Sequence, residues 1–529
     1  MTSLSERIAE SLSPSVTDVF GVMGNGNAYL LDALPRVGVR FTALRHEAGG
    51  VAAADAYFRA GGRLAVATTT YGAGFTNALT PLAEAVQARI PLVLVTGDAP
   101  TDGARPWDVD QRALARAVGA RWITATLDDP GAGRAVALAL AERTAVVLAI
   151  PHDLAALDAV PDSSTTEALE GPPTPDLSAA LTLLRAARRP LILAGRGAWL
   201  DDAGAALAAL ADRLGALTAT TALAAGLFPD DAHHLGIAGG FGSDEAAAVM
   251  RDADVVLVAG ASLSQFTLRF GELFGPDARL VQVDIEDAAT HPRVDAFLRG
   301  GARAVAQALV DGLPVASPPR WSDAPGGRAP RHTGDELAHD GRLDPRALAT
   351  ALDDLLPVDR TVVQDGGHFL GWAPSYWRIP GPNRLVMVGT AYQSIGLGFP
   401  SAVGAAVALP ETTVVLCTGD GGGLMAIADF ETFVRTARSG VVVVFNDAAY
   451  GAELHQYGSL DHAAMLIPEV DFAGVGVALG ATAAVVRSLG DLAALELWSG
   501  EGVLVLDCRI SRDVVAPYLR EWMHASHLD

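Results

Sequence analysis

The chain has 529 residues, 50% of them hydrophobic and 19% charged, and 61 acidic against 38 basic side chains give a formal net charge of −23. That length suits about three globular domains, and so acidic a chain should repel both nucleic acid and anionic membranes, which we therefore exclude as expected partners. All 38 basic residues are arginines, which excludes lysine Schiff-base chemistry and lysine-dependent phosphate loops.

The cysteines and the N-terminal residues indicate in which cellular compartment the protein is expected. The two cysteines, Cys417 and Cys508, lie within apolar runs and are expected in the core of a protein from a reducing compartment. The first twelve residues show no basic segment followed by an apolar one, and no run approaches the roughly 18 apolar residues of a membrane helix. We therefore expect a cytoplasmic protein.

The first part of the chain, residues 1–160, alternates between helix and strand patterns. Short apolar β-branched runs predict strands, and longer amphipathic or alanine-rich runs predict helices. The predicted strands are 64–68, 91–96 and 144–150, and the predicted helices are 51–60 and 78–88.

Two proline-rich polar segments, 161–175 and 314–340, read as linkers. They separate a second unit, 177–313, from the first and from a third, 341–529. The second unit has predicted strands 190–194, 255–259 and 280–285 and a predicted helix 203–214. The predicted fold class is α/β, with three α/β domains built on central parallel sheets. Their similar size suggests a repeated architecture, although no sequence repeats.

The stretch from 414 to 451 carries the strongest local pattern in the third unit. A buried strand at 414–417 leads into a glycine-rich turn at 419–423, then a predicted helix at 425–438 and a second strand at 441–445. A strand–turn–helix–strand unit is a crossover of a parallel sheet, whose ligand site lies at the carboxyl ends of the strands.

Two carboxylates leave these strand ends. Asp420 follows the first strand and Asp447 the second, so both could reach one Mg²⁺, which is commonly shared between carboxylates and a diphosphate. The alternative is an ordinary α/β turn in which Asp420 caps the following helix. A lone Gly-Asp-Gly turn favours that alternative.

Other segments also place a carboxylate or a glycine-rich turn at the start of a predicted helix. Glu47 follows Arg45-His46 at the start of a predicted helix and is either a carboxylate with raised pKa or the partner of Arg45. Glycine-rich turns recur at 69–77, 365–368 and 389–400, more than an unspecialised α/β unit needs.

Together these segments resemble the thiamine-diphosphate-dependent enzymes of the acetolactate synthase, pyruvate decarboxylase and benzoylformate decarboxylase group. The resemblance rests on the Arg-His-Glu turn at Glu47, the Ile150-Pro151 end of the first unit, the start of the second at 189–195, and Gly-Asp-Gly at Asp420, followed at the family's spacing by Asn446-Asp447. It covers nearly the whole chain. The family usually carries a second Asn where Asp447 stands.

The resemblance implies pyrimidine-binding, central and diphosphate-binding domains and a role for each matching residue. Glu47 would hydrogen-bond N1′ of the aminopyrimidine, the backbone carbonyl of Gln393 would accept from the 4′-amino group, and Ile395 would hold the cofactor bent. The Mg²⁺ ligands would be Asp420, Asp447 and the carbonyl of Ala449. The other cofactor-binding residues implied are Asn77, Gly367, His368, Gly421, Gly422, Tyr450 and Gly451. The active enzyme would be a homodimer or homotetramer, because Glu47 and the metal site come from different subunits.

The same resemblance implies a 2-oxo acid substrate. The reaction expected first is acetolactate-synthase-like carboligation, in which decarboxylation precedes addition to an aldehyde or ketone. A non-ligating decarboxylase, a C–C hydrolase of a diketone and a regulatory cofactor-binding subunit stay open as alternatives. The histidine of benzoylformate decarboxylases falls on Thr70, the paired histidines of pyruvate decarboxylases are missing after Pro100, and no flavin-binding pattern is recognisable, so FAD is not expected. Residues placed at the substrate by position are Asn25, Thr70, Tyr71, Gln111, Tyr392, Gln393, Ala452 and His455.

Overall fold

The computed structural model describes residues 2–103, 105–162, 175–229, 232–322 and 331–526. These residues form three α/β units, each with a sheet of six strands in which every pairing is parallel. The predicted fold class is therefore confirmed. Most of the linker predicted at 161–175 and part of that at 314–340 lie outside the described residues.

The first unit has the strand order β2-β1-β3-β4-β6-β5. Its strands are β1 (Asp18–Gly21), β2 (Arg40–Ala43), β3 (Ala65–Thr69), β4 (Leu92–Asp98), β5 (Arg121–Thr124) and β6 (Ala145–Pro151). Its helices are α1 (Leu4–Leu12), α2 (Ala28–Ala33), α3 (Glu47–Gly61), α4 (Ala73–Asn77), α5 (Leu79–Gln87), α6 (Gln111–Ala117) and α7 (Ala132–Glu142).

The second unit has the order β12-β11-β10-β7-β8-β9. Its strands are β7 (Pro190–Ala194), β8 (Leu217–Thr220), β9 (His234–Ile237), β10 (Val255–Ala259), β11 (Arg279–Asp284) and β12 (Val294–Arg299). Its helices are α8 (Ser178–Ala186), α9 (Arg196–Leu200), α10 (Gly204–Leu214), α11 (Asp244–Arg251) and α12 (Ala302–Gly312).

The third unit has the order β14-β13-β15-β16-β18-β17. Its strands are β13 (Arg360–Gln364), β14 (Leu385–Met387), β15 (Thr413–Gly419), β16 (Ser439–Asn446), β17 (Thr482–Val486) and β18 (Gly502–Arg509). Its helices are α13 (Pro345–Leu355), α14 (Trp372–Tyr376), α15 (Gly398–Ala408), α16 (Asp420–Met425), α17 (Ala428–Thr436), α18 (Gly451–Gln456), α19 (Phe472–Ala478), α20 (Ala493–Leu497) and α21 (Pro517–Ser526).

Strand order shows which units repeat. Numbered within each unit, the first and third sheets share the order 2-1-3-4-6-5, whereas the second has the order 6-5-4-1-2-3. The repeated architecture therefore relates the first unit to the third and leaves the second apart. In both related sheets the direction of winding changes between strands 1 and 3, which is where a ligand crevice forms in open α/β sheets.

The helix predicted at 425–438 is shorter in the structure, as α17, and only its first residue belongs to a separate helix, α16. The turn of glycines after β15 is already helical, so α16 begins at Asp420 and ends at Met425. Ala426 then leaves the helical region, with φ −111° and ψ 17°, and α17 starts at Ala428. The apolar period used for the prediction identifies the face of α17 but not this break.

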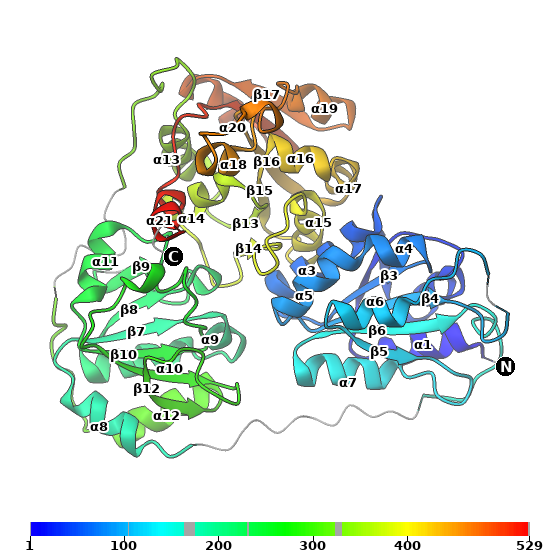
Figure 1. The fold of residues 1–529 in the computed structure, drawn as a ribbon, viewed down its shortest axis with the longest axis horizontal. Coiled ribbons are helices and arrows are strands. Elements are labelled where there is room, and N and C mark those ends of the chain that lie inside the picture. The colour runs from blue at the N-terminus through cyan, green and yellow to red at the C-terminus, as the bar shows by residue number, and fades with distance from the viewer. Residues whose placement is uncertain (1, 104, 163–174, 230–231, 323–330, 527–529) are drawn as a thin grey trace.

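The first and third units share one hydrophobic core. Helix α3 packs on α15, and their residues belong to one buried cluster with Phe399 and Phe430. In Figure 1, α3 and α5 of the first unit (blue) lie against α15 of the third (yellow), while the second unit (green) is joined to the third elsewhere. Across the part of the chain that the structure describes, no helix is long and apolar enough to cross a membrane.

Close approach of these two helices makes Gly404 a sensitive position. A Cβ added there would lie 2.0 Å from the carbonyl oxygen of Ala53 on α3. Gly404→Ala is therefore expected to lower the free energy of unfolding by about 1–3 kcal/mol or more, because the helices must separate. Urea denaturation measures this. Gly381→Ala is the control, since the nearest atom to its added Cβ would be 3.5 Å away, and equal stability of the two variants would contradict the close contact.

Candidate active site

The carboxyl ends of β13, β15 and β16 bring together the residues predicted in the third unit. Asp420 begins α16 directly after β15, and Asp447 follows β16. Gly367 and His368 follow β13, while Tyr450 and Gly451 lead into α18. All of these residues line a single cavity.

The two carboxylates proposed as metal ligands are buried, Asp420 at 1% exposure and Asp447 at 6%. Burial raises the pKa of Asp420 to about 6. Burial, with the neighbouring Asp420 charge, raises the pKa of Asp447 to about 7. Oδ2 of Asp420 is buried without a hydrogen-bond partner among the described residues. Two neighbouring buried carboxylates, neither of which forms a salt bridge within the described part of the chain, fit a hard metal ion such as Mg²⁺.

The glycines around this pair stand at positions too crowded for a side chain. A Cβ added at Gly421 would lie 2.7 Å from the Tyr450 ring, and one at Gly422 would lie 2.8 Å from Oδ2 of Asp365. A Cβ at Gly451 would lie 2.9 Å from Oδ2 of Asp447. The backbone therefore packs closely around Tyr450, Asp365 and Asp447 at these three positions.

His368 is held in one protonation state. The backbone N–H of Ala516 donates to its Nε2 at 2.8 Å, which places the ring proton on Nδ1. Burial, with the neighbouring His455, lowers the pKa of His368 to about 3, so the ring is neutral at physiological pH. Its Nδ1 lies toward Gly451, where it can donate to an anionic ligand.

Residues 389–397, here called the β14–α15 loop, carry Gln393 and Ile395. Gln393 has φ +55°, a left-handed conformation that is uncommon for a residue with a side chain. Asp365 holds the end of the loop, since its Oδ1 accepts from the N–H groups of Gly396 at 2.9 Å and Leu397 at 3.2 Å. Burial raises the pKa of Asp365. Strained conformations of this kind persist where surrounding contacts fix them, often at functional sites.

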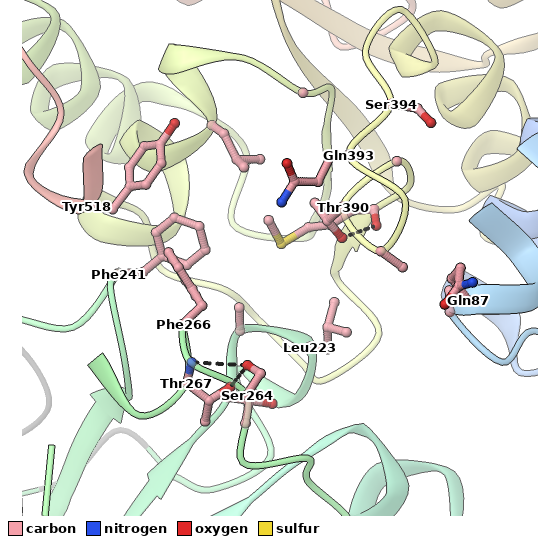
Figure 2. A pocket seen from close by; sticks show the side chains of 18 of the residues that line it. Gln87, Leu223, Phe241, Ser264, Phe266, Thr267, Thr390, Gln393, Ser394 and Tyr518 are labelled. Carbon is pink, nitrogen blue, oxygen red and sulfur yellow. Dashed lines mark hydrogen bonds between the residues drawn. The ribbon is translucent and has the colours of Figure 1, made fainter. Parts of the chain in front are cut away.

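The cavity has a volume of about 1130 Å³ and extends from these residues onto the second unit. Figure 2 shows Gln393 directed into the space between the two units, with Leu223, Ser264 and Thr267 on the opposite wall. Phe241, Phe266 and Tyr518 form an aromatic cluster at one side, with ring centroids 4.8 to 6.2 Å apart.

The predicted residues of the first unit form a second group. Asn77 donates to Oε2 of Glu47 at 3.0 Å, and Asn25 donates to the Tyr71 hydroxyl at 3.1 Å. A Cβ added at Gly74 would contact both Thr70 and Glu47. Gln111 is buried, and its Oε1 accepts from the N–H of Gly72 at 2.6 Å. The members of this group are Asn25, Glu47, Thr70, Tyr71, Asn77 and Gln111, and none of them lines the cavity.

Tyr392 and His455 also lie outside the cavity lining. The Tyr392 side chain is 51% exposed, and the His455 ring packs against His368 with centroids 4.7 Å apart. Ala452 does line the cavity, as placed from the sequence.

Three further residues were not singled out by the sequence. Asp365 was part of a glycine-rich turn without an assigned role, and Glu453 lines the cavity from α18. His152 follows β6, and its ring centroid is 5.6 Å from that of Tyr71. A polar residue directly after a buried strand was the available signal for Asp365 and His152.

Family models for the thiamine pyrophosphate enzymes, which bind the cofactor also called thiamine diphosphate, match all three units. The N-terminal TPP binding domain matches residues 2–130, the central domain 177–309 and the C-terminal TPP binding domain 365–508.

Individual relatives are similar over most of their length. A sulfoacetaldehyde acetyltransferase of Castellaniella defragrans is 29% identical, over 92% of this chain and 89% of the relative. A probable 2-ketoarginine decarboxylase of Pseudomonas aeruginosa is 31% identical, over 91% and 88%. The large subunit of acetolactate synthase isozyme 3 of Escherichia coli is 29% identical, over 85% and 83%.

Among solved structures, a thiamine diphosphate-dependent 4-hydroxybenzoylformate decarboxylase of Rhodococcus jostii has the same fold. It superposes with a TM-score of 0.81 over 96% of this chain and 99% of that one, at 21% identity. With family models matched in all three units and a relative 31% identical across 91% of the sequence, the chain belongs to the thiamine pyrophosphate enzymes.

Proposed function

We propose that this chain is a thiamine-diphosphate-dependent carboligase, which decarboxylates a 2-oxo acid and joins the remaining acyl unit to a second carbonyl compound. The observation that carries the proposal is the cavity. Its volume of about 1130 Å³ reaches from the proposed cofactor residues to the second unit. Pockets for drug-sized ligands measure roughly 300–1,000 Å³, so this one has room for cofactor and substrates together.

The residues present would hold the cofactor in the following way. Asp420, Asp447 and the carbonyl of Ala449 would bind Mg²⁺, and the backbone at Gly421 and Gly422 would surround the diphosphate. The carbonyl of Gln393 would accept from the 4′-amino group, and Ile395 would pack beneath the bend between the rings. When bound, thiamine diphosphate supplies the electron sink for decarboxylation. Glu47 would hold a proton at the pyrimidine N1′.

Ligation is favoured over simple decarboxylation by what surrounds Thr70. A decarboxylase that releases an aldehyde needs a proton donor beside the substrate. Thr70 stands where benzoylformate decarboxylases carry a histidine, and a hydroxyl, unlike an imidazole, does not exchange its proton near neutral pH.

A non-ligating decarboxylase is the second candidate, and His152 favours it. This imidazole lies edge-on to Tyr71 within the Glu47 group, 5.6 Å between ring centroids. An imidazole beside this group is a side chain that could deliver the proton that releases an aldehyde.

The active enzyme is proposed to be a homodimer or a larger homo-oligomer. Glu47 and its neighbours lie outside the cavity that contains Asp420 and Gln393. A complete site therefore needs the Glu47 group of a second copy placed over the cavity of the first.

The test is incubation of the purified protein with thiamine diphosphate, Mg²⁺ and a panel of 2-oxo acids, with and without aldehyde acceptors. A 2-hydroxy ketone is the expected product. Free aldehyde with CO₂ would favour the decarboxylase, and cleavage of a cyclic or 1,2-diketone would identify a hydrolase. No turnover on any member would favour a regulatory subunit. An absorption spectrum of the same sample checks for flavin.

A further inference from the structure

The β14–α15 loop is held from two units of the fold. Asp365, from its own unit, accepts N–H groups at the end of the loop, after Gln393. Glu84, on α5 of the first unit, accepts from the N–H of Tyr392 at 2.6 Å and from that of Ala391 at 3.3 Å. The left-handed residue Gln393 thus lies between two anchored segments, one of which depends on the other unit.

Glu84 is fully buried, at 0% exposure. Its Oε1 also accepts from Nη2 of Arg59 at 2.9 Å, and Arg59 pairs with Asp55, which is likewise at 0% exposure. A buried carboxylate is costly unless it is paired and hydrogen-bonded, and here one cation and two backbone N–H groups satisfy it. The β14–α15 loop of the third unit therefore supplies hydrogen bonds that the buried Glu84 carboxylate of the first unit needs.

The reverse contact occurs at Glu47. Asp429, on α17 of the third unit, is 2% exposed, and its Oδ1 accepts from the N–H of Arg45 at 2.8 Å. Its Oδ2 is so close to α3 that a Cβ added at Gly49 would lie 2.1 Å away. Asp429 thus accepts from the backbone before Glu47, as Glu84 does beside Gln393, and packs against the backbone after Glu47.

We propose that Glu84 and Asp429 are positioning residues, each holding from one unit the segment by which the other unit faces the cofactor. The inference rests on the proposed function for the roles of Gln393 and Glu47. Hydrogen bonds from a backbone N–H to a buried carboxylate are strong and directional. They can therefore fix the orientation of the strained turn at Gln393 and of the start of α3 at Glu47, which non-directional packing would not do. A purely structural contact would stabilise the units without controlling the local order of these two segments.

Hydrogen exchange of backbone amides, measured on the cofactor-free protein, tests the proposal without reference to activity. Glu84→Gln keeps the shape of the side chain but removes the charge that accepts the two N–H groups. Exchange within 389–397 is expected to rise at least about tenfold, while the segment at Arg45 keeps its protection. Asp429→Asn is expected to do the opposite, raising exchange at 45–47 and leaving the loop unchanged.

Asp55→Asn is the matched control, because it disrupts the same buried ion-pair network but does not touch the loop. If Glu84→Gln does not fold, Glu84→Asp replaces it, since the shorter side chain keeps its charge near Arg59 but withdraws from Tyr392. Loop exchange unchanged in the Glu84 variant, or raised equally in the Asp55 control, would overturn the positioning role.

Kinetics of the loaded enzyme give the second readout. Both positioning variants are expected to lower kcat at least tenfold while KM for the 2-oxo acid changes less than about threefold, because orientation and not substrate binding is lost. The unmodified protein could lack turnover on every substrate while the variants still show the expected changes in amide exchange. That combination would contradict the proposed function and support the positioning role. Normal kcat in both variants would overturn the positioning role and leave the proposed function standing.

Discussion

Replacing Glu47 by glutamine is expected to lower kcat by about two to four orders of magnitude while the fold stays intact. Glutamine has the size of glutamate but cannot hold a proton for the pyrimidine N1′. Glu47 is half-buried at the first position of α3, and its side chain accepts a 3.0 Å hydrogen bond from Asn77. That contact can be kept by the amide oxygen, so little stability should be lost.

Steady-state kinetics on the 2-oxo acid identified by the panel measure this loss, and circular dichroism and thermal melting check the fold. Glu10→Gln is the control, since Glu10 is exposed and, among the described residues, forms its salt bridge with Arg7 on the same helix. Glu47→Gln with nearly normal kcat would refute the role assigned to this carboxylate.

The sequence predicts the sheets of this protein better than it predicts the contacts between its units. Strands β7 and β10 begin and end where their apolar runs do, because a fully buried parallel strand consists of little else. The short helix at 420–425 and the break at Ala426 were missed, because three consecutive glycines predict a turn and carry no apolar period.

Site residues could be predicted where a local motif marks them and not where only tertiary packing does. Asp420, Asp447 and Glu47 could be named because their local patterns match a family, and the structure gathers the third-unit residues at one cavity. Glu84 could not be named, since its function depends on a loop 307 residues away that only tertiary packing brings to it. A buried glutamate within an amphipathic helix has no sequence signal of its own.

Asp420→Asn is expected to remove Mg²⁺-dependent binding of thiamine diphosphate, weakening it more than about a hundredfold. Calorimetric titration of the cofactor with and without Mg²⁺ measures this. Asp344→Asn is the matched control, because Asp344 is also a buried carboxylate of this unit but caps α13 and pairs with Arg346 instead. Cofactor binding by Asp420→Asn that still responds to Mg²⁺ would contradict the ligand assignment.

Loss of function in this variant should not be accompanied by loss of stability. Burial raises the pKa of Asp420 and Asp447, so ionisation of the pair destabilises the metal-free fold as the pH rises above the usual carboxyl range. A neutral asparagine removes one of the two charges. The metal-free variant is therefore expected to melt no lower than the unmodified protein at pH 8, which thermal melting in the presence of a chelator would check.

Mixing the two inactive variants tests whether sites are shared between copies. In a dimer formed from one Glu47→Gln chain and one Asp420→Asn chain, one site combines both substitutions and the other combines neither. Random exchange of subunits makes half of the dimers mixed, so activity should recover to about a quarter of the unmodified level. Sites built within single chains would stay inactive in every mixture. The mixture is partially denatured and renatured to exchange subunits, and each variant is treated alone as the control. Activity that recovers only in the mixture would show that the Glu47 group of one copy completes the cavity of another.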